Sequence, residues 1–229
     1  KVKYLILEKL LFQKKNDYGQ IGKLLKAKRV TTWVNCSMRM MPFYAGLKKD
    51  FNGQKITYIL HGNQSGLATD LIHHLDYIAF VTRSNEFSLD TTLLDKKTIG
   101  SKRKGYLEMT GTLTAKFKNG GLGLFRCDNK GSSPKTIEIF SEDKRYVIRE
   151  SESKALTSKA PDWQWQEISA PIPYQSQLTT TLVECLLKTG KCELSAYEES
   201  SKYHLLTLEP LLKFLNKNSK KKYNYYPFT

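Results

Sequence analysis

The first third of the chain repeats a unit in which a short apolar strand precedes an amphipathic helix. Helices are predicted where apolar residues recur at spacings of three and four, as do Tyr18, Ile21 and Leu25. Strands are predicted where β-branched and aromatic residues dominate a short run. The predicted strands are 2–7, 30–36 and 55–60, and the predicted helices are 17–28, 43–50 and 67–82. Three such units in succession are typical of an α/β layer.

From about Gly105 the hydrophobic period changes to two, which indicates strands that expose one face. Leu113, Ala115 and Phe117 mark the apolar side, and we expect them to pack on helices or on a second subunit. The fold class predicted is therefore α+β, with an α/β start followed by a large, predominantly antiparallel sheet. The predicted hairpins are 107–117 with 122–127 and 135–140 with 145–150, and the late helices are 174–189 and 196–217.

Composition places the chain among folded globular proteins. Of its 229 residues, 40% are hydrophobic and 26% are charged. No apolar run approaches the roughly 20 residues that a membrane helix needs. Glu8 and Lys9 interrupt the apolar opening before it could act as a signal peptide. We therefore predict a cytoplasmic protein with no membrane partner.

Basic residues outnumber acidic ones by 37 to 22, which gives a net charge of +15. Such a charge suits a polyanionic partner, but the lysines are scattered and no nucleic-acid-binding motif occurs. The prediction is that nucleic acid is not a partner. Of the four cysteines only Cys185 and Cys192 are near each other, at a spacing that fits neither zinc nor redox motifs. No metal site is predicted.

Three places carry candidate chemistry, and the first is Glu8-Lys9 at the end of the first strand. Ligands bind at the carboxyl ends of strands in open α/β sheets. A lysine is also an ordinary surface residue, and that alternative stays open for Lys9.

The second place is the polar set Asp70, His73, His74 and Asp76 within an otherwise apolar helix. Charged groups there are costly unless they are satisfied or functional. Asp70 can orient His73 at a spacing of three or His74 at a spacing of four. A purely structural hydrogen-bond cluster is equally compatible with this pattern.

The third place is the strand-to-helix junction that holds Arg39 and Tyr44. An arginine there can bind a hydroxyl, carboxylate or phosphate of a substrate, and it can equally form a structural ion pair. The run around Gly120 and Gly121 is not a phosphate loop, because no helix follows it.

In order along the chain, several short motifs are similar to those of one family. Residues 7–10, LEKL, resemble its E-K-P motif, with Leu10 in place of the proline. Residues 34–44, VNCSMRMMPFY, resemble a strand followed by R-x-x-P-x-Y. Residues 66–76, GLATDLIHHLD, resemble G-x-x-x-D-x-G-x-H-x-x-D with one residue fewer between Asp and His, and 192–201, CELSAYEESS, resemble its A-x-x-E-S stretch. The chain thus resembles the Gfo/Idh/MocA oxidoreductases.

The resemblance implies the substrate-binding and catalytic part of an NAD(P)-dependent oxidoreductase, built on a large open sheet with helices on one face. The G-x-G-x-x-G fingerprint that cradles a dinucleotide is absent from the sequence. Residues 1–30 would be the end of a dinucleotide-binding domain, and 31–229 the substrate, catalytic and oligomerisation domain. We expect NAD or NADP to bind in the full-length protein, next to Glu8 and Lys9, and not tightly to this chain.

The resemblance also assigns roles. His73 would be the general base, Asp70 its orienting carboxylate, and Lys9 the cation that steadies an alkoxide. The residues expected to contact substrate are Arg39, Tyr44, His74 and Asp76. The substrate would be a sugar or sugar nucleotide, and the chain would form a homo-oligomer through its sheet face. The alternative is a non-catalytic binding or oligomerisation module.

Overall fold

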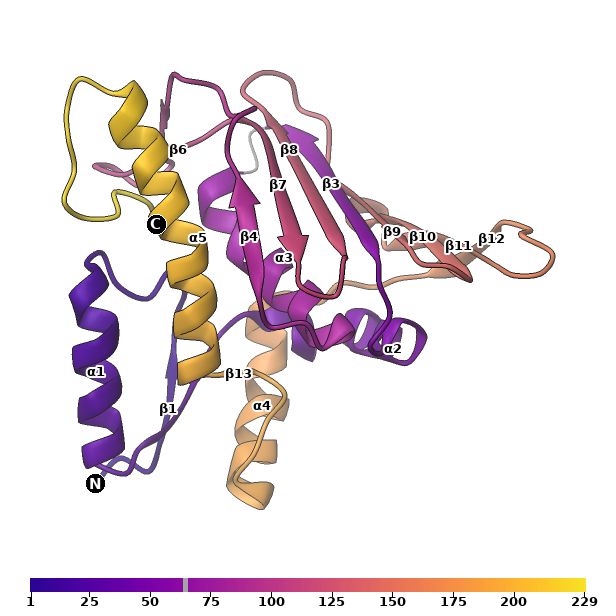
Figure 1. The fold of residues 1–229 in the computed structure, drawn as a ribbon. Coiled ribbons are helices and arrows are strands. Elements are labelled where there is room, and N and C mark those ends of the chain that lie inside the picture. Colours follow the sequence, from indigo (N-terminus) through magenta and orange to yellow (C-terminus); the bar gives the residue numbers. More distant parts are fainter. Residues whose placement is uncertain (64–65) are drawn as a thin grey trace.

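A computed structural model describes residues 1–63 and 66–229 (Figure 1). Near the N-terminus, β1 (Tyr4–Leu7) pairs in parallel with β2 (Thr31–Val34), and α1 (Lys15–Ala27) connects the two strands. The short strand β13 (Ser195–Ala196) adds to β2 in the antiparallel direction. The predicted α/β start is confirmed for these two parallel strands.

The rest of the molecule is built on an eight-stranded sheet in the order β12-β11-β10-β9-β3-β8-β7-β4. Only the β3–β8 pair is parallel, so the predominantly antiparallel sheet predicted from the period of two is confirmed. Its strands are β3 (Thr57–Asn63), β4 (Phe87–Asp90), β7 (Gly111–Phe117), β8 (Leu122–Asp128), β9 (Thr136–Phe140), β10 (Lys144–Arg149), β11 (Lys154–Lys159) and β12 (Gln166–Ser169).

The predicted third strand-helix unit is wrong in its placement. Strand β3 does not join the small parallel layer but lies between β8 and β9 in the large sheet. A run with a period of two identifies a strand, but its partners depend on which surfaces meet in three dimensions. The predicted strand 107–117 is also two strands, because β6 (Leu107–Glu108) pairs with β5 (Ile99–Gly100) before β7 begins at Gly111.

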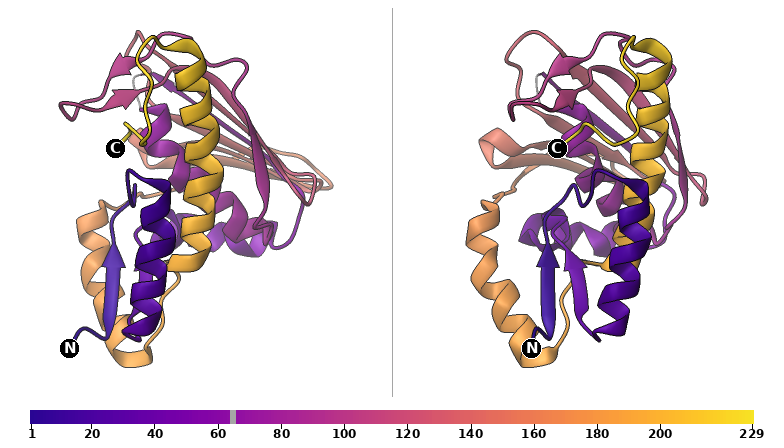
Figure 2. Two further views of the ribbon diagram at one scale, coloured as in Figure 1. Left: turned by 60° about the vertical axis from the view of Figure 1, so that its left-hand side comes forward. Right: turned by 90° about the vertical axis from the view of Figure 1, so that its left-hand side faces the viewer.

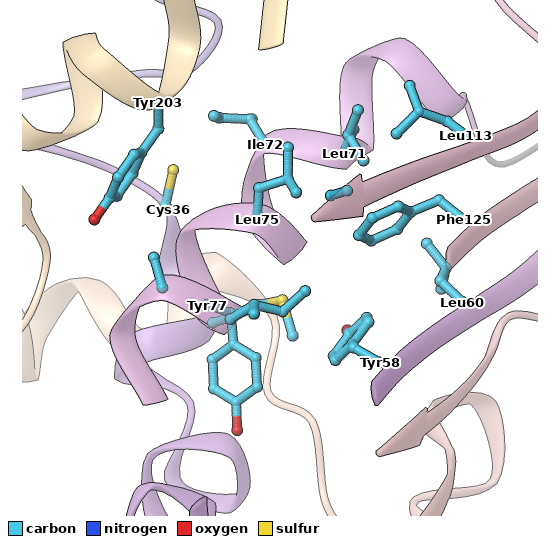
Figure 3. Packing of buried hydrophobic residues seen from close by; sticks show 14 of the residues in the cluster. Cys36, Tyr58, Leu60, Leu71, Ile72, Leu75, Tyr77, Leu113, Phe125 and Tyr203 are labelled. Atoms are coloured by element: carbon cyan, nitrogen blue, oxygen red, sulfur yellow. The ribbon is translucent and has the colours of Figure 1, made fainter. Parts of the chain in front are cut away.

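Helices cover one face of the large sheet, and no helix in the described part of the chain covers the other (Figure 2). They are α2 (Pro42–Phe51), α3 (Leu67–Thr82) and α5 (Tyr197–Asn218). Leu71 and Leu75 of α3 lie beside Leu113 and Phe125 of the sheet in the buried core (Figure 3). Leu113, Ala115 and Phe117 are all buried in this core, which confirms that they pack on helices.

A further helix, α4 (Gln175–Thr189), packs on the small layer through Leu182 and Leu186, which contact Trp33. No helix among residues 1–63 and 66–229 has the length and apolar character needed to cross a bilayer.

Gly111, where β7 begins, adopts a φ of +103°, and a β-carbon there would lie 2.6 Å from the Asp95 amide nitrogen. The opposing atoms are backbone, which cannot move aside as a side chain could. We expect Gly111→Ala to lower the free energy of unfolding by about 2 kcal/mol or more in urea denaturation. Gly46→Ala in α2 is the matched control, because a β-carbon there meets nothing within 4 Å. It should raise stability by about 0.5–1 kcal/mol, and equal effects of the two variants would contradict this account.

Candidate active site

Part of the predicted site lies where the carboxyl end of β1 meets the beginning of α3: Glu8 and Lys9 follow the strand, and Asp70, His73 and His74 lie on the helix. Glu8 follows β1, and its carboxylate accepts hydrogen bonds from the Asn35 amide at 2.7 Å and the Gln175 amide at 2.9 Å. The Lys9 ammonium donates to the backbone carbonyl of Thr69 at 2.8 Å. Lys9 is therefore not the freely solvated surface lysine of the alternative reading, and burial lowers its pKa.

A carboxylate from the β5–β6 hairpin fixes the beginning of α3. Glu108 accepts hydrogen bonds from the amides of Ala68, Thr69 and Met109 and from the Thr69 hydroxyl. A negative group at this end of a helix also interacts favourably with the helix dipole. Burial nevertheless raises the pKa of the Glu108 carboxyl. The hairpin thereby holds the turn of α3 that carries the candidate catalytic side chains.

Asp70 pairs with His74, although the spacing in the sequence allowed either His73 or His74 as its partner. His74 Nε2 lies 3.3 Å from Asp70 Oδ2, and its Nδ1 lies 2.6 Å from the Tyr58 hydroxyl. The Lys135 ammonium donates to the same Asp70 oxygen at 2.8 Å. Burial disfavours the charged form of Asp70, but His74 and Lys135 outweigh it and hold the pKa of this carboxyl well below its usual range.

His73 differs from His74 in its hydrogen bonding. Its Nδ1 is buried and has no hydrogen-bond partner among the residues described. Burial, together with the nearby charge of Lys9, lowers the pKa of His73 to about 3. The imidazole is therefore neutral near physiological pH, and a neutral imidazole can accept a proton from a bound hydroxyl. No hydrogen bond joins it to Asp70, the orienting partner that the resemblance implied.

Two residues without any sequence motif extend this polar cluster. Lys135 lies 3.9 Å from a carboxylate oxygen of Glu150, and the Tyr44 hydroxyl donates to the other oxygen at 2.6 Å. Tyr44 is fully buried, so its hydroxyl reaches the cluster only through Glu150. Lys135 and Glu150 lie at strand ends far from α3 in the sequence, and no local pattern could have identified them.

Arg39 and Asp76, both predicted to contact substrate, pair with each other in the interior. They are 5% and 0% exposed, with Arg39 Nε 2.6 Å and Nη2 2.9 Å from the two Asp76 oxygens. Glu199 adds a third contact to the guanidinium at 3.3 Å. Burial alone would lower the pKa of Arg39, but the Asp76 carboxylate outweighs it and raises that pKa. The geometry favours the structural ion pair that the sequence also allowed.

Lys9 and Thr69 open onto a hollow with a volume of about 430 Å³. Lys102 and Arg103, from the loop between β5 and β6, also line it. A larger hollow of about 830 Å³ lies at the other end of β3, and no predicted site residue lines it. Of the predicted site residues, Lys9 lines the smaller hollow, which is therefore the candidate substrate site. Within the described ranges, no group of three or more His, Cys, Asp or Glu side chains is arranged to hold a metal ion.

His204 on α5 is a second buried imidazole. Its Nδ1 donates to the Ser200 carbonyl at 2.8 Å, and its buried Nε2 has no partner among the described residues. Burial lowers the pKa of His204 from 6.5 to about 4. Between these two values the unfolded chain binds a proton that the folded chain excludes, so the free energy of unfolding should rise with pH by up to about 1.4 kcal/mol per unit.

Urea denaturation of the wild type and of His204→Gln across this pH range measures the effect. In the variant, the free energy of unfolding should rise less steeply with pH, because the contribution of His204 is lost. The same slope in both proteins would contradict the assignment.

Neither a protein-family model nor a curated protein matches the chain. Solved structures do match it. UDP-N-acetylglucosamine 3-dehydrogenase from Acidithiobacillus ferrooxidans superposes with a TM-score of 0.69 at 9% identity, over 93% of this chain and 71% of that one. An oxidoreductase from Agrobacterium radiobacter, solved with NAD+, L-tartaric acid and magnesium, gives 0.69 at 16% identity over the same shares.

The super-repressor mutant of Gal80p from Saccharomyces cerevisiae gives a TM-score of 0.62 at 15% identity, over 95% of this chain and 72% of that one. Sequence identities this low show similarity of fold alone. The chain therefore has the fold of the Gfo/Idh/MocA-type oxidoreductases, over most of its own length and about 70% of theirs.

Proposed function

We propose that the chain is the substrate-binding and catalytic part of an NAD(P)-dependent oxidoreductase that acts on a carbinol carbon of a sugar or sugar nucleotide. One observation carries the proposal: the Lys9 ammonium binds the Thr69 carbonyl, one helical turn before the neutral His73. A cation and a proton acceptor thus lie together at the carboxyl end of a strand, where α/β proteins bind ligands.

In this proposal the neutral imidazole of His73 accepts the proton of the substrate hydroxyl. Lys9 stabilises the negative charge that develops on the oxygen as the proton leaves. The nicotinamide, when bound, accepts the hydride. Asp70 does not contact His73, so its contribution is to hold His74 and Lys135 in place behind the reacting groups.

The residues present fit one end of such a cofactor. Glu8 is held by two amides beside Lys9 at the end of β1, and these two side chains would adjoin the nicotinamide. No G-x-G-x-x-G occurs in the sequence, so the pyrophosphate would be held by a dinucleotide-binding domain of which residues 1–30 form the end. Residues 31–229 would then bind the substrate and form subunit contacts.

The direct test is reduction of NAD+ or NADP+ by the full-length natural protein in the presence of hexoses, polyols and nucleotide-linked sugars. We expect one sugar class to support saturable reduction with one of the two cofactors. The name of the Acidithiobacillus neighbour makes nucleotide-linked amino sugars a suitable part of the panel. Absence of reduction with every sugar and both cofactors would overturn the proposal.

A non-catalytic module is the second candidate, and two observations favour it. One structural neighbour is by its name a repressor. The uncovered sheet face also carries a cross-strand row of partly exposed apolar side chains, Leu156, Val147, Ile59 and Leu124, interrupted by Glu138. Homo-oligomerisation through this face fits either candidate. Titration of the full-length protein with NAD(H) separates them, because a module without catalysis needs no cofactor.

A further inference from the structure

The loop between β5 and β6, which lines the candidate substrate site together with Lys9, is strongly basic. Between Asp95 and Glu108 the sequence contains five cationic residues and no acidic one. These residues are Lys96, Lys97, Lys102, Arg103 and Lys104. So dense a run of like charge is repulsive unless it is solvated or bound to an anion.

The hairpin that carries this loop is fixed over the first turn of α3. Ile99 pairs with Glu108, and the Glu108 side chain binds the α3 amides. The tip of the hairpin places Lys102 and Arg103 on the wall of the hollow that Lys9 also lines. Arg103 is oriented further by a hydrogen bond from its Nη1 to the Thr229 hydroxyl at 2.9 Å.

In the described part of the chain, the cations that line the hollow form no close ion pair. Among residues 1–63 and 66–229, no carboxylate lies within 4.0 Å of the charged groups of Lys9, Lys102 or Arg103. The acidic side chain that lines the hollow, Glu108, already accepts hydrogen bonds from the start of α3. By contrast, Arg149 on the large sheet pairs with both Glu152 and Glu167.

We propose that Lys102 and Arg103 form a binding subsite for a phosphoryl group of the substrate. This inference rests on the proposed function, which places the reacting hydroxyl at Lys9 and His73. A guanidinium binds phosphate oxygens through two parallel N–H donors, and a lysine adds a point charge. The hollow of about 430 Å³ is within the range that holds a small ligand, so a sugar at Lys9 can extend its phosphoryl group to the hairpin.

Titration calorimetry of this chain with inorganic pyrophosphate at low salt tests the subsite. We expect saturable binding that weakens about tenfold or more in Lys102→Ala/Arg103→Ala, because the variant removes both charged donors to the phosphate oxygens. Lys96→Ala/Lys97→Ala is the matched control. It removes the same charge from exposed positions of the same segment that do not line the hollow, and its affinity should stay near that of the wild type.

Two results would overturn the subsite: absence of saturable binding, or an equal loss of affinity in both double variants, which would reflect general charge alone. Thermal unfolding of the variants shows whether they are folded, and the exposed positions make misfolding unexpected. Glucose 1-phosphate should displace bound pyrophosphate more effectively than ADP, which represents the cofactor. The opposite order would overturn the assignment to substrate.

The two proposals fail separately. If the full-length protein oxidises uncharged sugars while this chain binds no pyrophosphate, the inference fails and the proposed function stands. If pyrophosphate binds as expected while no sugar supports NAD(P)+ reduction, the subsite stands and the proposed function fails.

Discussion

Replacing His73 by alanine in the full-length natural protein should lower kcat by on the order of 10²-fold or more, the usual contribution of a positioned general base. The fold should tolerate the change, because the His73 Nδ1 has no hydrogen-bond partner to lose among the described residues. Lys9→Met should reduce kcat by a similar factor, since it keeps the apolar stem and removes the charge that stabilises the alkoxide.

Steady-state kinetics and urea denaturation of the same proteins test this prediction. His74→Ala is the control, because it leaves the Tyr58 hydroxyl and the Asp70 carboxylate without their shared partner. It should lower the free energy of unfolding by about 1–3 kcal/mol. If His74→Ala alone abolishes turnover and the folded state is intact, the Asp70–His74 pair is the working base. If both histidine variants lose stability and neither changes turnover, the cluster is structural.

The pH dependence of kcat/KM tests independently whether His73 is the general base. A general base must be deprotonated, and burial lowers the pKa of His73 to about 3. The acid limb of kcat/KM in the free enzyme should therefore lie well below pH 6.5, the ordinary value for histidine. Lys9 must stay charged, and its pKa is lowered, so the alkaline limb should lie below the ordinary lysine value of 10.5. An acid limb near pH 6.5 would contradict His73 as the base.

Arg39→Ala should destabilise the fold more than most single substitutions, by about 3–5 kcal/mol. The change leaves Asp76, which is 0% exposed, without the two hydrogen bonds that the guanidinium donates to its carboxylate. Removing one member of a buried ion pair leaves the other charge uncompensated in a poorly polarisable interior. Urea denaturation of the wild type and variant gives the loss directly.

Two control variants distinguish the contribution of the buried Arg39–Asp76 pair to stability from that of Glu199. Glu199→Gln removes the half-exposed partner of Arg39 and should cost at most about 1 kcal/mol. Arg39→Met/Asp76→Leu removes both charges together and should recover much of the stability lost in Arg39→Ala. If Arg39→Ala unfolds as the wild type does and instead raises KM, Arg39 contacts the substrate, as the resemblance implied.

The sequence alone predicted the five α-helices that the structure describes, but not the strands β4, β11 and β12. The helix predicted at 67–82 coincides with α3, because twelve of its sixteen residues are buried and the apolar spacing is unambiguous. The turn at Asn119 and Gly120 between two alternating segments correctly predicted the β7–β8 hairpin. Strand-end position and spacing also sufficed to bring Lys9, Asp70 and His73 to attention, because these signals lie within one element.

Tertiary structure decided which of these elements and side chains meet. Strand β3 reads as a third α/β strand, yet its neighbours are β8 and β9. Asp70 has two candidate histidines one residue apart, and Tyr58 with Lys135 secures the one that it binds. Lys135 and Glu108 carry no motif at all. Hydrophobic period specifies which side of an element turns inward, whereas ion pairs and buried hydrogen bonds depend on the packing of elements far apart in the chain.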